Sequence, residues 1–140
     1  LESQLPAINQ EIEKILAGVS DFGVELKTSS SSNAMDIYIT HNDTKRIVET
    51  ASGMEKMFCS LAIRVALSNL SSLPKSNIFI IDEGFGVLDE NNIDLCLQML
   101  QTLKNYYKTI LIISHISEVK EVVDHIIEIK NNGKYSYVSN

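Results

Sequence analysis

Two adjacent carboxylates, Asp82 and Glu83, directly follow an uninterrupted apolar run, residues 78–81. Such a run, without polar alternation, is typical of a strand that is buried on both faces. Charged side chains rarely occur at the mouth of a buried strand unless they have a partner, and open α/β sheets bind ligands at the carboxyl ends of their parallel strands. We therefore predict that these two carboxylates face a metal ion and a reacting phosphate.

The start of a helical pattern at Ser52 and Gly53 supports two interpretations. Ser52 and Glu55 have the spacing of a capping box, in which each side chain accepts a hydrogen bond from the other residue's backbone amide, so a helix cap alone would explain them. The same arrangement leaves amides free at the positive end of the helix dipole, where a phosphate can bind, and a glycine there permits close approach of the backbone. The residues themselves leave both interpretations open.

A third segment, Ser114 and His115, follows a second apolar run, residues 109–113. The pattern predicts a buried strand that ends at these residues, and a histidine can donate a hydrogen bond to a phosphate oxygen. The sequence contains no glycine-rich phosphate loop of the G-x-x-x-x-G-K-S/T kind, because its six glycines have other spacings. The cradle for a nucleotide would therefore have to come from another segment.

The composition favours one compact domain that is neither basic nor membrane-spanning. The chain has 140 residues, of which 44% are hydrophobic, and a net charge of −6, so its surface as a whole should not attract nucleic acid. No apolar run has the length of a membrane span and no signal-peptide pattern opens the sequence, so we expect a cytoplasmic, nucleoid or nuclear protein that is not secreted. Cys59 and Cys96 stand among apolar neighbours in helical patterns, and we expect both to be reduced core residues.

The order of the predicted elements is that of an α/β domain with a small antiparallel meander and a mainly parallel sheet flanked by helices. Residues 1–19 repeat apolar side chains in steps of four and three, a heptad seam that fits either a helix packed on its own domain or the end of a coiled coil. Because this seam is already present at Leu1, we expect the sequence to be a piece of a longer protein. Alternating, apolar and helical patterns predict the other elements: strands at 22–26, 35–39, 45–50, 78–81, 109–113, 125–129 and 134–138, and helices from 53 to about 70, 90 to about 104 and 117 to about 122.

Taken together, Ser52-Gly53, Asp82-Glu83 and Ser114-His115 resemble the C-terminal lobe of an ABC-type ATPase head of the SMC and SbcC class. The run Asp-Glu-Gly-Phe-Gly-x-Leu-Asp, from Asp82 to Asp89, is most similar to SbcC, which is called Rad-fifty in eukaryotes and archaea. The resemblance implies an α/β lobe in two parts. Residues 1–19 would be the end of a coiled-coil helix, and residues 20–140 would carry the signature, Walker B, D-loop and H-loop motifs.

The resemblance also implies a role for each matching residue. Asp82 corresponds to the Walker B aspartate that holds Mg²⁺, Glu83 to the carboxylate that polarises the attacking water, and His115 to the switch histidine that touches the γ-phosphate. Asp89 corresponds to the D-loop aspartate at the dimer interface. Met54 stands where the family usually has a second glycine or a small residue, so it could crowd a γ-phosphate or lie aside against the core. The signature motif, which contacts ATP held by the opposing subunit, corresponds to Ser52, Gly53, Met54, Glu55 and Lys56.

By resemblance, the protein is an ATPase that uses ATP and Mg²⁺ and is active only when this lobe is combined with the N-terminal Walker A lobe of the same protein. Its implied partners are a second head in a homodimer, an SbcD-type nuclease (Mre-eleven in eukaryotes) and DNA, with no membrane partner, in double-strand-break repair and recombination. Two alternatives are a chromosome-organising SMC head and a nucleotide-gated clamp that does not hydrolyse ATP. The Gly84-Phe85-Gly86 run favours repair, and the charged residues at the strand ends disfavour the clamp.

Overall fold

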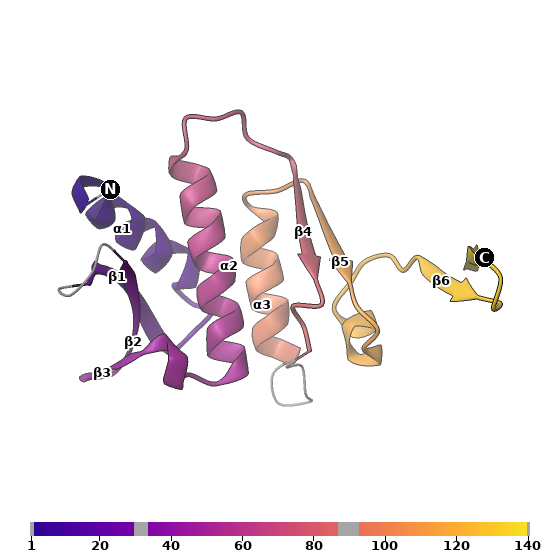
Figure 1. Cartoon of the computed structure of the whole chain (residues 1–140), viewed down its shortest axis with the longest axis horizontal. Helices are drawn as coiled ribbons and strands as arrows, with labels where there is room; N and C mark the ends of the chain where they lie inside the picture. The colour runs from indigo at the N-terminus through magenta and orange to yellow at the C-terminus, as the bar shows by residue number, and fades with distance from the viewer. Residues whose placement is uncertain (1, 30–33, 87–92, 140) are drawn as a thin grey trace.

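The computed structural model of the chain describes residues 2–29, 34–86 and 93–139. Figure 1 shows helices α2 and α3 between an N-terminal helix with a three-stranded meander and a pair of strands, β4 and β5, beyond which a C-terminal hairpin projects. The α/β fold class predicted from the sequence is confirmed. The elements are, in chain order, a 3₁₀ turn (Glu2–Gln4), α1 (Leu5–Leu16), β1 (Phe22–Thr28), β2 (Met35–His41), β3 (Thr44–Ile47), a 3₁₀ turn (Val48–Thr50), α2 (Gly53–Leu70), β4 (Ile78–Asp82), α3 (Ile93–Lys104), β5 (Thr109–Ile113), a 3₁₀ turn (Ser117–Glu121), β6 (Glu128–Asn131) and β7 (Ser136–Ser139).

Helix α1 uses the predicted heptad seam to pack on its own domain. Pro6 lies in the first turn, where its missing amide donor costs no hydrogen bond. The seam side chains are buried from Leu5 through Ile15, and Asn9 fixes the position of the helix against β1. Its amide oxygen accepts from the Leu26 backbone N–H at 2.8 Å, and its amide nitrogen donates to the Leu26 carbonyl at 3.0 Å. The end of a coiled coil within residues 1–19 stays a prediction.

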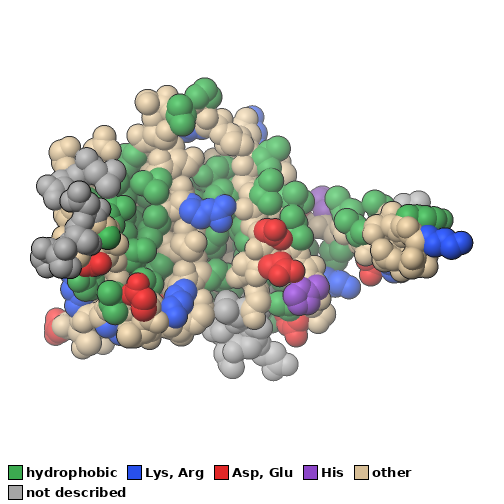
Figure 2. Space-filling view, in the orientation of Figure 1, with side chains coloured by type: hydrophobic (Ala, Val, Ile, Leu, Met, Phe, Trp, Pro, Cys, Tyr) green, Lys and Arg blue, Asp and Glu red, His purple; other side chains and the backbone are tan. Residues whose placement is uncertain are grey.

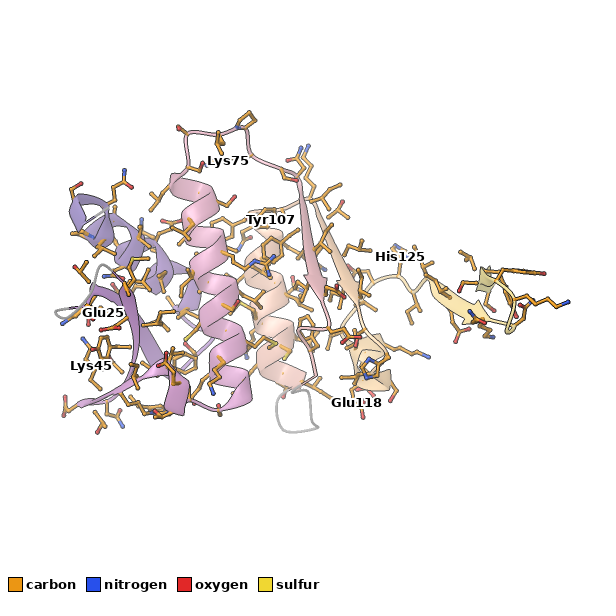
Figure 3. The ribbon with its side chains drawn as sticks, in the orientation of Figure 1. Glu25, Lys45, Lys75, Tyr107, Glu118 and His125 are labelled. Carbon is orange, nitrogen blue, oxygen red and sulfur yellow. The ribbon has the colours of Figure 1, made fainter. Side chains whose placement is uncertain are left out.

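The meander pairs β1, β2 and β3 in antiparallel order. Its inner face carries the expected alternating apolar residues, including Val24 opposite Ile39. On the outer face Lys45 forms an ion pair with Glu25 and lies over the Tyr38 ring, and Figure 3 shows Lys45 and Glu25 close together at this edge of the molecule. The third strand is shorter than the predicted 45–50, because the chain turns into a 3₁₀ helix at Val48–Thr50.

Strands β4 and β5 are parallel neighbours, with Asp82 opposite Ile113. The expectation that residues 78–81 are buried on both faces is wrong for this chain. Phe79 and Ile81 point into the core, whereas the other face of the pair remains exposed, because the described helices cover only one side. The exposed apolar residues are Ile78 (53%), Ile80 (49%), Leu111 (43%) and Ile113 (48%), and Figure 2 shows hydrophobic side chains at the surface over these strands.

The C-terminal hairpin has different bounds from the predicted ones. Strand β6 begins at Glu128 rather than at His125, which is exposed, and β7 begins at Ser136 rather than at Lys134. The late start of β7 has a local reason: the Asn131 side chain accepts from the Gly133 amide at 2.6 Å, and the Asn132 side chain accepts from the Lys134 amide at 3.0 Å. These Asn contacts stabilise a longer turn, in which Gly133 has a positive φ of 87°.

The core contains both cysteines, as expected. Cys59 lies on α2 and Cys96 on α3, and each is almost fully buried. Burial and the nearby charge of Glu55 raise the pKa of the Cys59 thiol to about 11, so this thiol stays protonated at neutral pH. Helix α3 is described from Ile93 to Lys104; the predicted helix start at residue 90 lies outside the described residues.

Candidate functional site

The carboxyl ends of β4 and β5 bring together three of the residues singled out in the sequence. Asp82 ends β4, and the next residue, Glu83, continues the ladder by donating its backbone N–H to the Ile113 carbonyl at 2.8 Å. His115 follows the end of β5, and its Nδ1 lies 3.5 Å from Oε1 of Glu83. The Glu83 and His115 side chains are 70% and 79% exposed. Two carboxylates and one imidazole are therefore available to a ligand at one sheet edge.

The loop after β4 holds Glu83 in an unusual backbone conformation. Its φ is +50°, in the left-handed region that costs a side-chain-bearing residue about 1 kcal/mol. The next residue is a glycine by necessity, since a Cβ on Gly84 would lie 2.7 Å from Cγ2 of Ile81. Phe85 is fully buried and anchors the loop in the core. Strain held in place by the surrounding structure is a frequent property of functional sites.

The donor set at this edge suits magnesium. Asp82 offers exposed carboxylate oxygens, the ligand type that Mg²⁺ prefers, and Mg²⁺ commonly keeps several waters beside one or two protein carboxylates. Within residues 2–29, 34–86 and 93–139, no three His, Cys, Asp or Glu side chains are grouped so as to hold a metal ion. Any ion at Asp82 would therefore take its other ligands from water, from phosphate oxygens or from another segment.

Ser52 and Glu55 form the predicted capping box at the start of α2. The Ser52 hydroxyl accepts from the Glu55 amide at 3.3 Å, and the Glu55 carboxylate accepts from the Ser52 amide at 2.7 Å. Glu55 is only 7% exposed, and its second oxygen lies 2.5 Å from Nη2 of Arg46. Burial raises the pKa of Glu55, but the Ser52 hydrogen bonds and Arg46 outweigh burial and lower the pKa overall. The carboxylate is thus a charged group satisfied within the protein.

The other signature positions differ in exposure. Gly53 and Lys56 are exposed at the helix start, whereas Met54 is half-buried and packs against the core. Met54 also lines a hollow beside Ser52, so its effect on a γ-phosphate stays a prediction. Asp89, the predicted D-loop aspartate, lies outside the described residues. The structure thus presents Ser52, Gly53 and Lys56 outward and turns Glu55 inward.

A hollow of about 670 Å³ lies beside Ser52 and Met54. His41, at the end of β2, lines it, and its Nε2 lies 3.5 Å from Oδ1 of Asp21 on the loop before β1. The sequence pattern does not single out His41 or Arg46 as site residues. The alternation of β2 does place His41 on the same face as Ile39, so strand register was the available signal for its position near the core.

No family model matches the chain, but sequence relatives and solved structures do. It is 31% identical over 99% of its length to an uncharacterized protein of Acanthamoeba polyphaga mimivirus, and 32% identical over 70% of its length to the SbcC subunit of the SbcCD nuclease of Staphylococcus aureus. It spans 11% and 10% of these two curated relatives. A structure from work on ATP-driven dimerization and DNA-stimulated activation of SMC ATPases superposes with a TM-score of 0.75 at 19% identity, covering 98% of this chain and 84% of that one.

The parallel strand pair, the capped helix and the carboxylate–histidine edge define the C-terminal lobe of an ABC-type ATPase head. The chain belongs to the SbcC family of these ATPases, and it shares its fold with SMC heads. Within the described parts of the chain, no helix is both long and apolar enough to cross a lipid bilayer.

Proposed function

We propose that this chain supplies the water-activating and cross-subunit half of a split ATP site. With an N-terminal Walker A lobe it would bind and hydrolyse ATP, and the cycle would drive dimerisation of two heads in DNA double-strand-break repair. The observation that carries this proposal is the pairing of Glu83 with His115 at the carboxyl end of two parallel strands, where α/β sheets bind their ligands. The isolated lobe lacks a phosphate loop, so the proposed site is completed by another segment.

Each residue at the edge has a distinct task in this proposal. Asp82 holds Mg²⁺, which when bound neutralises phosphate charge. Glu83 accepts a hydrogen bond from the attacking water and orients it, since phosphoryl transfer depends mainly on positioning and charge stabilisation. The Nδ1 atom of His115 lies beside the Glu83 carboxylate, which leaves Nε2 to donate to a γ-phosphate oxygen. Asp82 is the last residue of β4, whereas the Glu83 side chain lies beside His115, so in this proposal Asp82 reaches the metal and Glu83 reaches the water.

The exposed apolar face of β4 and β5 supports docking of the N-terminal lobe. Four large aliphatic side chains on neighbouring strands are 43–53% exposed on the same face, and an exposed contiguous apolar patch marks an interaction surface. The chain spans about a tenth of its curated relatives, so most of such a protein lies outside this segment. In the proposal, the N-terminal lobe covers this face and completes the burial that the apolar run 78–81 predicts.

We propose the repair role and the partners on the basis of sequence similarity. A relative is named as part of the SbcCD nuclease, which supports an SbcD-type nuclease and DNA as partners, and an intracellular site of action. Residues 1–19 would be the end of a coiled coil that leaves the head. A chromosome-organising SMC head is the second candidate, because the solved structures that share the fold are SMC heads. Cleavage of DNA ends by a complex with an SbcD-type nuclease would separate the two candidates.

The isolated chain is expected to hydrolyse no ATP, whereas the same chain mixed with its N-terminal lobe is expected to show Mg²⁺-dependent hydrolysis. The reason is that this chain offers carboxylates and a histidine but no phosphate cradle. Phosphate release with and without the added lobe, in Mg²⁺ and in EDTA, measures this directly. Robust turnover by the isolated chain would contradict the split-site proposal, and so would a mixture that binds ATP no better than either part.

Replacing Ile80 with aspartate is expected to weaken association with a separately supplied N-terminal lobe by about tenfold or more, because a charge would replace an aliphatic group in the buried interface. Isothermal titration of one lobe with the other gives the change in affinity. Leu73→Asp is the matched control, since Leu73 is 73% exposed on the loop before β4 and lies outside the proposed interface. Equal affinities for both variants and the wild type would show that the lobe docks elsewhere.

A further inference from the structure

Glu55 is the one charged side chain that is buried among the described residues. It lies in the third position of α2, directly after the exposed Ser52 and Gly53. Its two oxygens have separate partners: one accepts from the Ser52 backbone amide, and the other pairs with Arg46. A buried carboxylate without a counter-charge is strongly disfavoured, so the inward position of Glu55 depends on Arg46.

Arg46 reaches this position from a different element. It lies on the inner face of β3, opposite Ile39, and its second guanidinium nitrogen donates to the Thr50 carbonyl at 2.9 Å. One guanidinium group therefore holds both the backbone that leads into α2 and the carboxylate that caps it. Arginine suits this task because its planar fork can bind two acceptors at fixed angles.

An outward Glu55 would place a negative charge at the start of α2, where the proposed function puts the phosphates of a nucleotide bound by the opposing subunit. Like charges in this position repel. With Glu55 held inside, the exposed start of the helix offers backbone amides, the positive end of the helix dipole and Lys56. The direction of the Glu55 side chain therefore sets the sign of the local potential.

We infer that Arg46 is a positioning residue for nucleotide contact: it holds the Glu55 carboxylate inside the head and so keeps the Ser52–Lys56 segment open to an anion. This inference rests on the proposed function, because it concerns ATP that an opposing head presents. It differs from the role implied by resemblance, in which Glu55 itself contacts ATP. In this inference Arg46 acts through its contacts with Glu55 and Thr50 rather than by contacting the nucleotide.

The test compares four variants of the full-length protein. Arg46→Gln is expected to raise the ATP concentration for half-maximal head dimerisation by about tenfold, because an unpaired buried carboxylate turns outward. Its turnover number at saturating ATP should change much less, since the edge at Glu83 is untouched. Glu55→Gln should be mild, because a neutral amide still accepts from the Ser52 amide. The double variant Arg46→Gln/Glu55→Gln should recover most of the affinity, since no buried charge remains.

Lys45→Gln is the matched control. It removes one positive charge from the same strand, but on the outer face, where Lys45 pairs with Glu25 (Figure 3). Dimerisation is followed by analytical ultracentrifugation across an ATP titration, and amide hydrogen exchange reports on residues 50–56 without nucleotide. Faster exchange in this segment is expected for Arg46→Gln and not for Lys45→Gln, because opening of the cap exposes the Ser52 amide.

Two results would overturn the inference: unchanged ATP dependence and exchange in Arg46→Gln, or a double variant as defective as the single one. A tenfold rise in the ATP concentration for half-maximal dimerisation of Lys45→Gln would also overturn the inference, since the effect would then come from the loss of any positive charge on β3. A wild-type protein that does not dimerise with ATP would instead remove the proposed function. In that case unchanged exchange at residues 50–56 would remove the positioning role as well, and faster exchange would retain it as a property of the fold.

Discussion

Replacing Glu83 with glutamine in the full-length protein is expected to lower ATP turnover by about 100-fold or more, the usual contribution of a positioned acid–base group. ATP-dependent dimerisation of the heads should persist. Glutamine keeps the size and shape of the side chain, so the φ of +50° and the hydrogen bond from the backbone N–H to the Ile113 carbonyl can remain. It cannot accept a water proton as a carboxylate can. Single-turnover hydrolysis and an ATP-dependent sedimentation shift separate the two effects.

Glu121→Gln provides the control for this change. Glu121 is an exposed carboxylate at the end of the 3₁₀ turn after His115, so its replacement removes the same charge from the same side of the lobe without altering the edge. Turnover in this variant should equal that of the wild type. If Glu83→Gln hydrolysed ATP at the wild-type rate, another group would have to accept the proton of the water, and the proposed role of Glu83 in activating the water would be lost.

The local features of the site could be predicted because their causes are local. The capping box needs only a serine and a glutamate three residues apart, and the structure confirms it at Ser52 and Glu55. The meeting of Glu83 and His115 follows from two apolar strands in a parallel pair, whose carboxyl ends share an edge. The roles assigned to these residues remain predictions, because geometry alone does not show a reaction.

The features that depend on distant pairing could not be predicted. Arg46 lies inside because β3 pairs with β2 so that Arg46 faces Ile39, while Ile47 pairs with Tyr38 and lies on the outer face, 38% exposed. Hydrophobicity alone would have placed Ile47 inside, and a strand of four residues is too short for its alternation to correct this. Only the register of the sheet decides which residue reaches Glu55.

The exposed face of β4 differs from the sequence-based prediction for another reason. An unbroken apolar run does indicate burial on both faces. The sequence pattern reflects the surroundings of the strand in the complete protein, whereas the structure contains one lobe. Ile78 and Ile80 are exposed because no described part of this chain packs over them. The mismatch between pattern and exposure supports the docking of the N-terminal lobe proposed above.

Replacing Phe85 with alanine is expected to destabilise the lobe by about 3–5 kcal/mol, the usual cost of removing a buried aromatic ring. Phe85 is fully buried although it lies in a loop, so the ring joins the β4 edge to the core. Domains of this size have about 5–15 kcal/mol of total stability, so the loss is a large share. Urea unfolding followed by circular dichroism gives the change in free energy of unfolding.

Two controls separate the anchoring role from the loss of a side chain. Leu73→Ala, at a position that is 73% exposed, should change the stability by no more than about 0.5 kcal/mol. Phe85→Leu should keep most of the burial and lose less stability than alanine. If Phe85→Ala were as stable as Leu73→Ala, the loop would not be anchored by its ring. If the expected loss is found, the strained Glu83 conformation two residues earlier is held by core packing, and turnover should fall with stability even though the Glu83 side chain is intact.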